Sequence, residues 1–362
     1  MSNRQELMDA VQRRKPARIP YTFDARPETQ ELLHAHLGLK ASANLAEYFG
    51  CNTFDSLWSA LGKSPALPER EARNRSGNPD ERVDIWGIRR GIQETGGARY
   101  WEITGYPLAA AETVADIERY DWPRPAEVVF PDIPPGLDLA AWKRDRVILD
   151  MGYIGPYGIA WNMRGMEQVM LDMALNPGLV DAMVNKIEEF TLGCLDIVFT
   201  RYPGMLDLIG CGDDYGSQKG LLMSVDMINR FFFPSLKRHY DFGRKHGVSA
   251  YHHCCGAIFD LIPSFIDAGL EVLNPIQTSA DGMEPVRIKK TFGRNLCFHG
   301  AIDTQQTLAH GTPKQVRAEV RQRMDELGPD GYILAPSHTL QPNVPMDNIV
   351  ALYEAAQAYG KL

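Results

Sequence analysis

The sequence has no long apolar run, few cysteines and no excess of basic residues, and each absence excludes a class of protein. No stretch reaches the roughly 20 apolar residues that a membrane-spanning helix needs. The opening segment, Met1–Met8, lacks the apolar centre of a signal peptide. Six cysteines in 362 residues, two of them adjacent, are not the pattern of a disulfide framework. We therefore expect a cytoplasmic protein with no membrane anchor.

The charge balance argues against a nucleic-acid partner. The chain has 38 Lys and Arg against 46 Asp and Glu, a net charge of −8. Nucleic-acid binding calls for clustered basic residues, which are missing here. With 44% hydrophobic and 23% charged residues, the composition is that of a globular protein. The length fits either two domains or one α/β barrel.

From residue 140 onward, short apolar runs alternate with amphipathic segments of helical length. Such alternation is typical of parallel β/α architecture. We expect strands at Val147–Leu149, Met205–Ile209, Val248–His253, Val272–Ile276, Leu296–Gly300 and Tyr332–Ala335. We expect helices at Met166–Phe190, Met227–His246, Ile258–Ala268 and Pro313–Leu327. The predicted fold is an α/β protein, a distorted (β/α)8 barrel.

Residues 24–145 are less regular and follow a predicted first strand at Arg18–Phe23. Within them, Val83–Arg90 and Ala98–Ile103 flank Glu94-Thr95-Gly96-Gly97, which predicts an antiparallel hairpin around a Gly-Gly turn. We interpret 24–145 as an insertion and connector in a single domain over 1–362. The alternative is a separate N-terminal domain of about 130 residues.

The stretch Tyr251-His252-His253-Cys254-Cys255-Gly256 is the strongest chemical signal. Imidazole and thiolate are the ligands that Zn²⁺ prefers. Since side chains alternate along a strand, His253 and Cys255 face one way while His252 and Cys254 face the other. A His-x-Cys pair can chelate one ion, although a buried Cys beside a hydrogen-bonded His explains the same residues.

Polar residues follow most of the predicted strands, at the end where barrel enzymes carry their chemistry. Asp213 and Asp214 follow one strand, Gln277 another, Asp303 a third and His338 the last. Each has an ordinary structural interpretation: an aspartate there can be a turn residue or helix cap. The histidine within a predicted strand, His299, is more typical of a satisfied core residue, and Cys51, Cys194 and Cys297 of small buried hydrophobes.

Several motifs together resemble the uroporphyrinogen decarboxylase superfamily, which also contains zinc-dependent methyltransferases that act with corrinoid proteins. The resemblance runs from about residue 15 to the C-terminus. It rests on Gly212-Asp213-Asp214-Tyr215-Gly216-Ser217-Gln218-Lys219-Gly220, His253-Cys254-Cys255-Gly256, His299-Gly300-Ala301-Ile302-Asp303, Gly331–His338 and Pro342–Ile349. It implies a distorted (β/α)8 barrel, in agreement with the strand pattern.

Within this superfamily, the chain is more similar to the methyltransferase branch. The segment Tyr21–Glu28 has one arginine and two acids, not the pair of arginines expected opposite a polycarboxylate. The methyltransferases hold zinc with a His-x-Cys pair and a distant Cys. His253 and Cys255 match the pair, while the distant position is His338, a departure that zinc tolerates. The decarboxylases also have histidine there, so His338 does not separate the branches; a fourth ligand would be Asp213, Asp214 or substrate.

The resemblance implies a zinc-dependent methyltransferase that moves a methyl group between a corrinoid protein and a small molecule, either a thiol or a methoxylated compound. The methylcobamide would be carried by a separate protein. The alternative is a metal-independent decarboxylase of a small carboxylic acid, in which Asp213 or Asp214 stabilises a protonated intermediate and His338 or Tyr157 delivers the proton. A third reading is a non-catalytic protein that binds a small ligand in the barrel.

Residue type suggests aromatic walls for the pocket. We expect these walls to comprise Trp86, Tyr153, Tyr157, Trp161, Met163 and Phe298, which would favour an aromatic or modestly apolar substrate. Gln277 completes the predicted substrate-binding set. A homodimer would be an ordinary state for such an enzyme.

Overall fold

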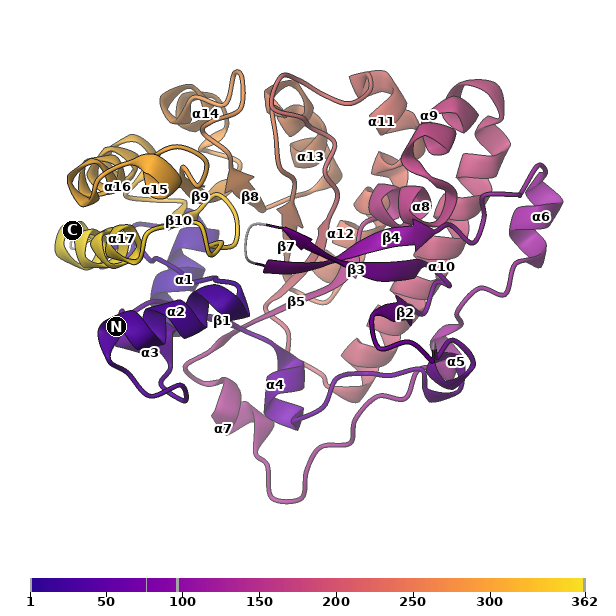
Figure 1. Ribbon diagram of the computed structural model, residues 1–362, viewed down its shortest axis with the longest axis horizontal. Helices are drawn as coiled ribbons and strands as arrows, with labels where there is room; N and C mark the ends of the chain where they lie inside the picture. Colours follow the sequence, from indigo (N-terminus) through magenta and orange to yellow (C-terminus); the bar gives the residue numbers. More distant parts are fainter. Residues whose placement is uncertain (1, 76, 96–97, 361–362) are drawn as a thin grey trace.

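The architecture is a curled parallel sheet surrounded by helices (Figure 1). The computed structural model describes residues 2–75, 77–95 and 98–360. Seven strands follow the order β1-β5-β6-β7-β8-β9-β10, and every pairing is parallel. Their bounds are β1 Phe54–Asp55, β5 Val147–Ile154, β6 Leu208–Gly212, β7 Ser249–His253, β8 Val272–Ile276, β9 Cys297–Ile302 and β10 Tyr332–Pro336. The predicted α/β class and strand order are confirmed.

Single backbone pairings connect the two edges of this sheet. The Thr22 N–H donates to the Leu334 carbonyl at 3.0 Å, and the Asn52 N–H donates to the Tyr21 carbonyl at 2.7 Å. The segment around Tyr21 therefore lies between β10 and the chain just before β1. The strand predicted at Arg18–Phe23 is reduced to isolated bridges there, and the curled sheet becomes barrel-like.

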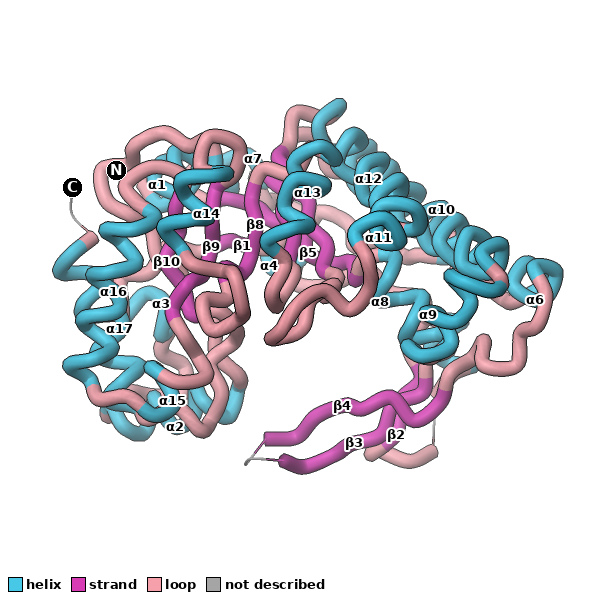
Figure 2. Tube along the Cα trace, turned by 90° about the horizontal axis from the view of Figure 1, so that it is seen from above, coloured by secondary structure: helices cyan, strands magenta, loops and turns pink. Residues whose placement is uncertain are grey.

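Helices cover the outer face of the sheet (Figure 2). The amino-terminal third contributes α1 Asn3–Val11, α2 Pro27–Leu37, α3 Leu45–Tyr48, α4 Leu57–Leu61, α5 Pro68–Arg73, α6 Val114–Arg119 and α7 Leu139–Lys143. The remainder contributes α8 Pro156–Arg164, α9 Met166–Leu175, α10 Pro177–Arg201, α11 Val225–Phe231, α12 Phe233–Lys245, α13 Ile262–Ala268, α14 Pro285–Phe292, α15 Thr307–His310, α16 Pro313–Leu327 and α17 Met346–Tyr359. Short 3₁₀ turns lie at Pro125–Glu127 and Phe259–Leu261. Among the helices so described, none is long and apolar enough to cross a membrane.

Two segments predicted as single helices are each divided in two. The first, Met166–Phe190, divides where α9 ends at Leu175 and α10 begins at Pro177, because proline has no N–H to continue the ladder. The second, Met227–His246, divides between α11 and α12 at Phe232. Pro234 follows in the first turn of α12, where its missing N–H costs nothing.

Apolar side chains fill the inside of the curled sheet and leave one end for polar groups. Leu7, Ala10 and Val11 of α1 lie in one buried cluster with residues near the starts of the strands. These strand residues are Val147, Leu208, Tyr251, Val272, Cys297 and Ile333. Each fully buried aliphatic side chain contributes roughly 1.5–3 kcal/mol. Since α1 covers the amino ends of the strands, their carboxyl ends are left for polar groups.

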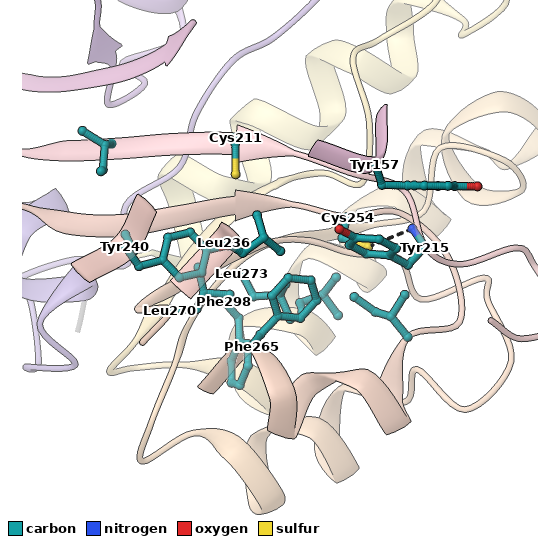
Figure 3. Close-up of a cluster of buried hydrophobic side chains, with 14 of the residues drawn as sticks. Tyr157, Cys211, Tyr215, Leu236, Tyr240, Cys254, Phe265, Leu270, Leu273 and Phe298 are labelled. Carbon is teal, nitrogen blue, oxygen red and sulfur yellow. Dashed lines mark hydrogen bonds between the residues drawn. The ribbon is translucent and has the colours of Figure 1, made fainter. Parts of the chain in front are cut away.

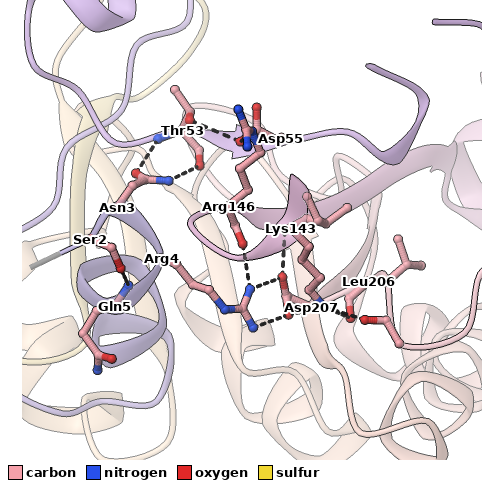
Figure 4. A network of polar contacts seen from close by, with 12 residues as sticks. Ser2, Asn3, Arg4, Gln5, Thr53, Asp55, Lys143, Arg146, Leu206 and Asp207 are labelled. Carbon is pink, nitrogen blue, oxygen red and sulfur yellow. Dashed lines mark hydrogen bonds and ion pairs between the residues drawn. The ribbon is translucent and has the colours of Figure 1, made fainter. Parts of the chain in front are cut away.

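An ion-pair network fastens α1 to that closed end (Figure 4). Arg4 donates to both oxygens of Asp207, at 2.6 and 2.8 Å, and the Lys143 ammonium lies 2.8 Å from the same carboxylate. Burial alone would raise the pKa of Asp207, but these bonds and the Ile148 N–H outweigh it and lower the pKa below its ordinary value. The network therefore stabilises the fold while Asp207 stays ionised.

The irregular segment holds a three-stranded antiparallel sheet of β2 Glu81–Val83, β3 Arg89–Thr95 and β4 Ala98–Gly105. The β3–β4 pairing is the predicted hairpin, although its Gly96-Gly97 turn lies outside the described residues. The prediction that Val83–Arg90 forms the first strand of the hairpin was wrong. The chain instead turns after β2, where the Asp84 carboxylate accepts hydrogen bonds from the N–H groups of Trp86 and Ile88 at 2.9 and 3.1 Å.

The hairpin reaches the barrel at its far end. The Tyr100 hydroxyl donates to the Gln341 side-chain oxygen at 2.8 Å, and Arg26 donates to the Arg99 carbonyl at 2.8 Å. The Arg26 guanidinium also lies 4.8 Å from the centre of the Tyr100 ring, a cation–π distance. In Figure 1 the hairpin passes in front of the strands toward the loop that follows β10.

Candidate metal centre

Three ligand-type side chains converge at the carboxyl ends of β7 and β10. His253 is the last residue of β7, Cys255 follows two residues later, and His338 lies two residues beyond β10. One ligand atom from each lies within 4.8 Å of the other two. His253 Nε2 and Cys255 Sγ lie 3.4 Å apart. Ligands of one tetrahedral zinc stand about 3.3–3.8 Å apart, given bonds of about 2.0–2.3 Å. The three residues fit a zinc ion after small side-chain movements.

The neighbouring strand orients the His253 ring. His253 pairs in register with Asn274 on β8, and the Asn274 side-chain oxygen lies 2.7 Å from His253 Nδ1. An amide oxygen can only accept, so Nδ1 carries the proton and Nε2 keeps its lone pair. That free nitrogen lies on the Cys255 side. A hydrogen-bonded partner on the second ring nitrogen is the usual arrangement of metal-binding histidines.

Close backbone packing fixes the position of Cys255. A Cβ on Gly256, whose φ is +98°, would stand 2.6 Å from the Gly216 carbonyl carbon, so only glycine fits. The Gly256 N–H donates to the Gln277 side-chain oxygen at 2.7 Å, and the Cys255 N–H donates to the Asp214 carboxylate at 2.7 Å. Burial and the nearby Asp214 carboxylate raise the pKa of the Cys255 thiol to about 12. A metal that binds there must displace the thiol proton.

The two adjacent aspartates have different surroundings. Asp213 is 2% exposed and accepts from the N–H groups of Tyr157 and Gly158 at 3.2 and 2.6 Å, which caps the start of α8. It also accepts from the Tyr215 hydroxyl at 2.8 Å. Burial raises the pKa of Asp213 to about 7 despite these bonds, which lower it. Asp214 is exposed and lies beside the cluster, so it is the aspartate available to a ligand.

A cavity of about 570 Å³ adjoins Cys255, His338 and Asp214. Its other walls consist mainly of amide and hydroxyl side chains, including Gln218, Gln277, Thr304, Gln305, Gln341 and Asn343. The Gln341 side chain, held by Tyr100, connects this cavity to the hairpin. The sequence did not indicate that contact, which joins positions 241 residues apart.

The predicted aromatic walls lie elsewhere. Phe298 and Met163 are fully buried in the core, and Trp161 packs against it from a half-buried position. Trp86 lines a second cavity with Trp58 and Phe130, on the outer side of β5. The Tyr153 side chain lies outside the described part of the structure. Of the predicted substrate-binding residues, Gln277 lines the cavity beside the cluster. The predicted wall residues that lie in the core stabilise the fold there, because burying a large apolar side chain is favourable.

Tyr157 is also a core residue (Figure 3). Its ring is fully buried and stacks on Tyr215 with centroids 5.4 Å apart. Burial and the Asp213 and Asp214 carboxylates raise the pKa of Tyr157 to about 12. Its hydroxyl has no hydrogen-bond partner among the described residues. Its backbone N–H, which binds Asp213, is its clearest contribution to the site.

The remaining strand histidines are buried away from the cavity. His252 is 0% exposed and its Nδ1 lies 2.7 Å from the Tyr240 hydroxyl. His299 lies between the hydroxyls of Thr22 and Tyr251, at 2.8 and 2.9 Å. Burial lowers the pKa of both imidazoles to about 3. They are neutral core residues, as the strand alternation and the position of His299 predicted.

Comparison with known proteins identifies the family. Residues 100–359 match the family model described as uroporphyrinogen decarboxylase (URO-D). The match covers well over half of the chain, so this protein belongs to the URO-D family. A solved methyltransferase from Methanosarcina mazei has the same fold, with a TM-score of 0.65, 18% identity and 99% of both chains covered.

A relative with an assigned activity matches part of the chain. Over 153 residues the sequence is 29% identical to the methylcobamide:CoM methyltransferase MtaA of Methanosarcina barkeri. The match spans 42% of this chain and 42% of that protein. The chain therefore covers less than half of the length of this relative.

Proposed function

We propose that this protein is a zinc-dependent methyltransferase that moves a methyl group between a separate corrinoid protein and a small molecule. The observation that carries the proposal is the convergence of His253, Cys255 and His338 at one open end of the sheet. The similarity to the methylcobamide:CoM methyltransferase supports the reaction class. A metal held by three protein ligands keeps a coordination position for substrate, which is typical of catalytic zinc.

The residues of the site have separable tasks. His253, Cys255 and His338 would hold the zinc, which supplies a Lewis acid for a thiol or a methylated heteroatom. Asn274 keeps the His253 lone pair directed toward the cluster. Asp214 fixes the Cys255 backbone through one carboxylate oxygen. The Asp214 carboxylate also faces the Cys255 thiol, and it would accept the proton that an incoming thiol or hydroxyl releases. Asp213, whose oxygens bind the start of α8, is a positioning residue in this proposal.

Methyl transfer from free methylcobalamin tests the proposal. The assay offers a panel of thiols, and in the reverse direction methoxylated compounds with reduced cobalamin, to the zinc-loaded protein. We expect transfer that fails in His253→Ala and persists in His310→Ala, which removes an exposed histidine at the end of α15.

The same assay separates the alternative chemistry. Release of CO₂ from a small carboxylic acid by metal-free protein, without methyl transfer, would replace this proposal by a decarboxylase. Retained transfer activity in His253→Ala would also contradict it, since the imidazole would then not be a ligand.

A further inference from the structure

The cavity beside the cluster is lined by neutral hydrogen-bonding groups. Among the described residues that line it, none is a lysine, an arginine, a phenylalanine, a tyrosine or a tryptophan. Asp214 is the one carboxylate there. Apart from the cluster and Val344, the other lining residues are amides and hydroxyls. A cavity of about 570 Å³ falls within the usual range for a small-molecule site.

Several of these groups are available to a ligand. The side chains of Gln218, Gln305 and Asn343 have no hydrogen-bond partner in the described part of the chain. The Gln277 oxygen is bound by the Gly256 N–H, which holds the side chain in place and leaves its NH₂ group without a described partner. Each amide presents both donors and an acceptor, so the walls match a molecule that carries several hydroxyl groups.

An anionic ligand would find no counter-charge among the side chains of the wall, and the charge of a bound Zn²⁺ would be offset in part by the Cys255 thiolate. Carboxylates and sulfonates are ordinarily bound by Arg or Lys. Two cations near the wall are already paired: Lys219, next to Gln218 in sequence, with Asp281 at 3.4 Å, and Arg26, whose backbone N–H binds the Leu340 carbonyl, with Glu28 at 3.3 Å. Asp214 would add repulsion. Since the Cys255 thiolate and the Asp214 carboxylate together balance the charge of one Zn²⁺, a further negative charge in the cavity would be desolvated without a net positive charge to compensate it.

An aromatic ligand would find no ring to pack on. Tyr157 and Phe298 follow or belong to strands of the sheet, yet both are fully buried in the core. The aromatic side chain nearest by contact is Tyr100, whose ring is occupied by the Arg26 guanidinium and whose hydroxyl binds Gln341.

We propose that this cavity takes a neutral, hydroxyl-rich small molecule, such as a sugar or polyol methyl ether, in preference to an anionic thiol or an aromatic ether. The proposal rests on the proposed function, since it names the substrate class of the same site. The observation behind it is the set of amide and hydroxyl walls without a described cation or ring.

Calorimetric titration of the zinc-loaded protein with a matched pair of glycosides tests this proposal. Methyl glucoside and methyl glucuronoside have the same ring and differ by a carboxylate in place of a hydroxymethyl group. We expect the neutral glycoside to bind at least tenfold more tightly than the anion, and more tightly than guaiacol or mercaptoethanesulfonate. Equal or tighter binding of any of these three, or no binding of the glucoside, would overturn the proposal.

A gain-of-function variant locates the ligand. Gln305→Arg places a cation in the wall, and we expect it to raise the affinity for the glucuronoside about tenfold. Gln322→Arg on α16 makes the same charge change away from the cavity, where its side chain hydrogen-bonds Glu326, and should leave that affinity unchanged. No gain in Gln305→Arg would mean that the ligand lies elsewhere.

Zinc content measured on the same samples separates the two proposals. If the protein holds zinc but does not bind the glucoside, the methyltransferase proposal stands and the proposed substrate class is wrong. If the protein holds no zinc but binds the glucoside, the methyltransferase proposal is wrong and the assignment of the cavity to a hydroxyl-rich ligand stands.

Discussion

Exchanging Asp213 for asparagine should destabilise the protein, whereas the same exchange at Asp214 should leave its stability almost unchanged. Asp213→Asn replaces an acceptor oxygen by an NH₂ donor inside a pocket that already holds two N–H donors of α8. The Tyr215 hydroxyl can rotate to accept, but one backbone N–H cannot. One unmatched buried donor costs about 1–3 kcal/mol. Asp214→Asn keeps the oxygen that binds the Cys255 N–H on an exposed side chain, and such a change stays within about 0.5 kcal/mol.

Urea denaturation at about pH 8.5, above the pKa of about 7 of Asp213 so that its carboxyl is ionised, measures this difference by circular dichroism. We expect a lower midpoint for Asp213→Asn at unchanged slope, and a wild-type midpoint for Asp214→Asn. Methyl-transfer rates of the two variants should also differ at least tenfold, a barrier change of about 1.4 kcal/mol. Equal midpoints would refute the capping role of Asp213 and leave the pair as an ordinary turn.

Three further predictions address the ligand shell, the closed end and the hairpin. Asn274→Ala removes the hydrogen bond to His253 Nδ1 and should weaken zinc binding 10–100-fold in chelator competition, whereas an unchanged affinity would exclude an orienting role. Asp207→Asn should destabilise the protein more at pH 7 than near pH 3, because a lowered pKa contributes its full stability above the unfolded value of about 3.9 and loses it as the pH falls toward the folded pKa; urea midpoints that differ equally at both pH values would contradict this. Tyr100→Phe removes the bond to Gln341 and should speed trypsin cleavage at Arg99, and unchanged cleavage would mean that this bond does not hold the hairpin.

The end of β7 was predictable from sequence because two local signals agreed there, whereas β5 and β6 each extend beyond the ends predicted at Leu149 and Ile209. Val248–His253 begins with a short apolar run and is followed within three residues by Gly256, and β7 begins one residue later than predicted and ends at His253. Strand alternation separated the buried His252 from the half-buried His253 before any tertiary information was used. Asn274 could also have been found, since β8 follows β7 in the parallel order and sets the two residues in register.

The cavity walls were not predictable in the same way. Aromatic side chains near strand ends can face either the ligand or the core, and residue type does not distinguish these positions. The helical breaks at Pro177 and Phe232 were obscured by continuous amphipathic patterns on both sides. The pairing of Tyr100 with Gln341 depends on how a hairpin lies across the barrel, which no local pattern encodes.

Metal analysis of purified protein tests the central claim most directly. Cys255→Ala removes the thiolate of the cluster, while Cys51→Ala removes another half-buried free cysteine outside it. Mass-spectrometric metal analysis should find about one zinc ion per chain in the wild type and in Cys51→Ala, and almost none in Cys255→Ala with unchanged circular dichroism. Wild-type protein that takes up no zinc, or equal zinc in both cysteine variants, would contradict the account.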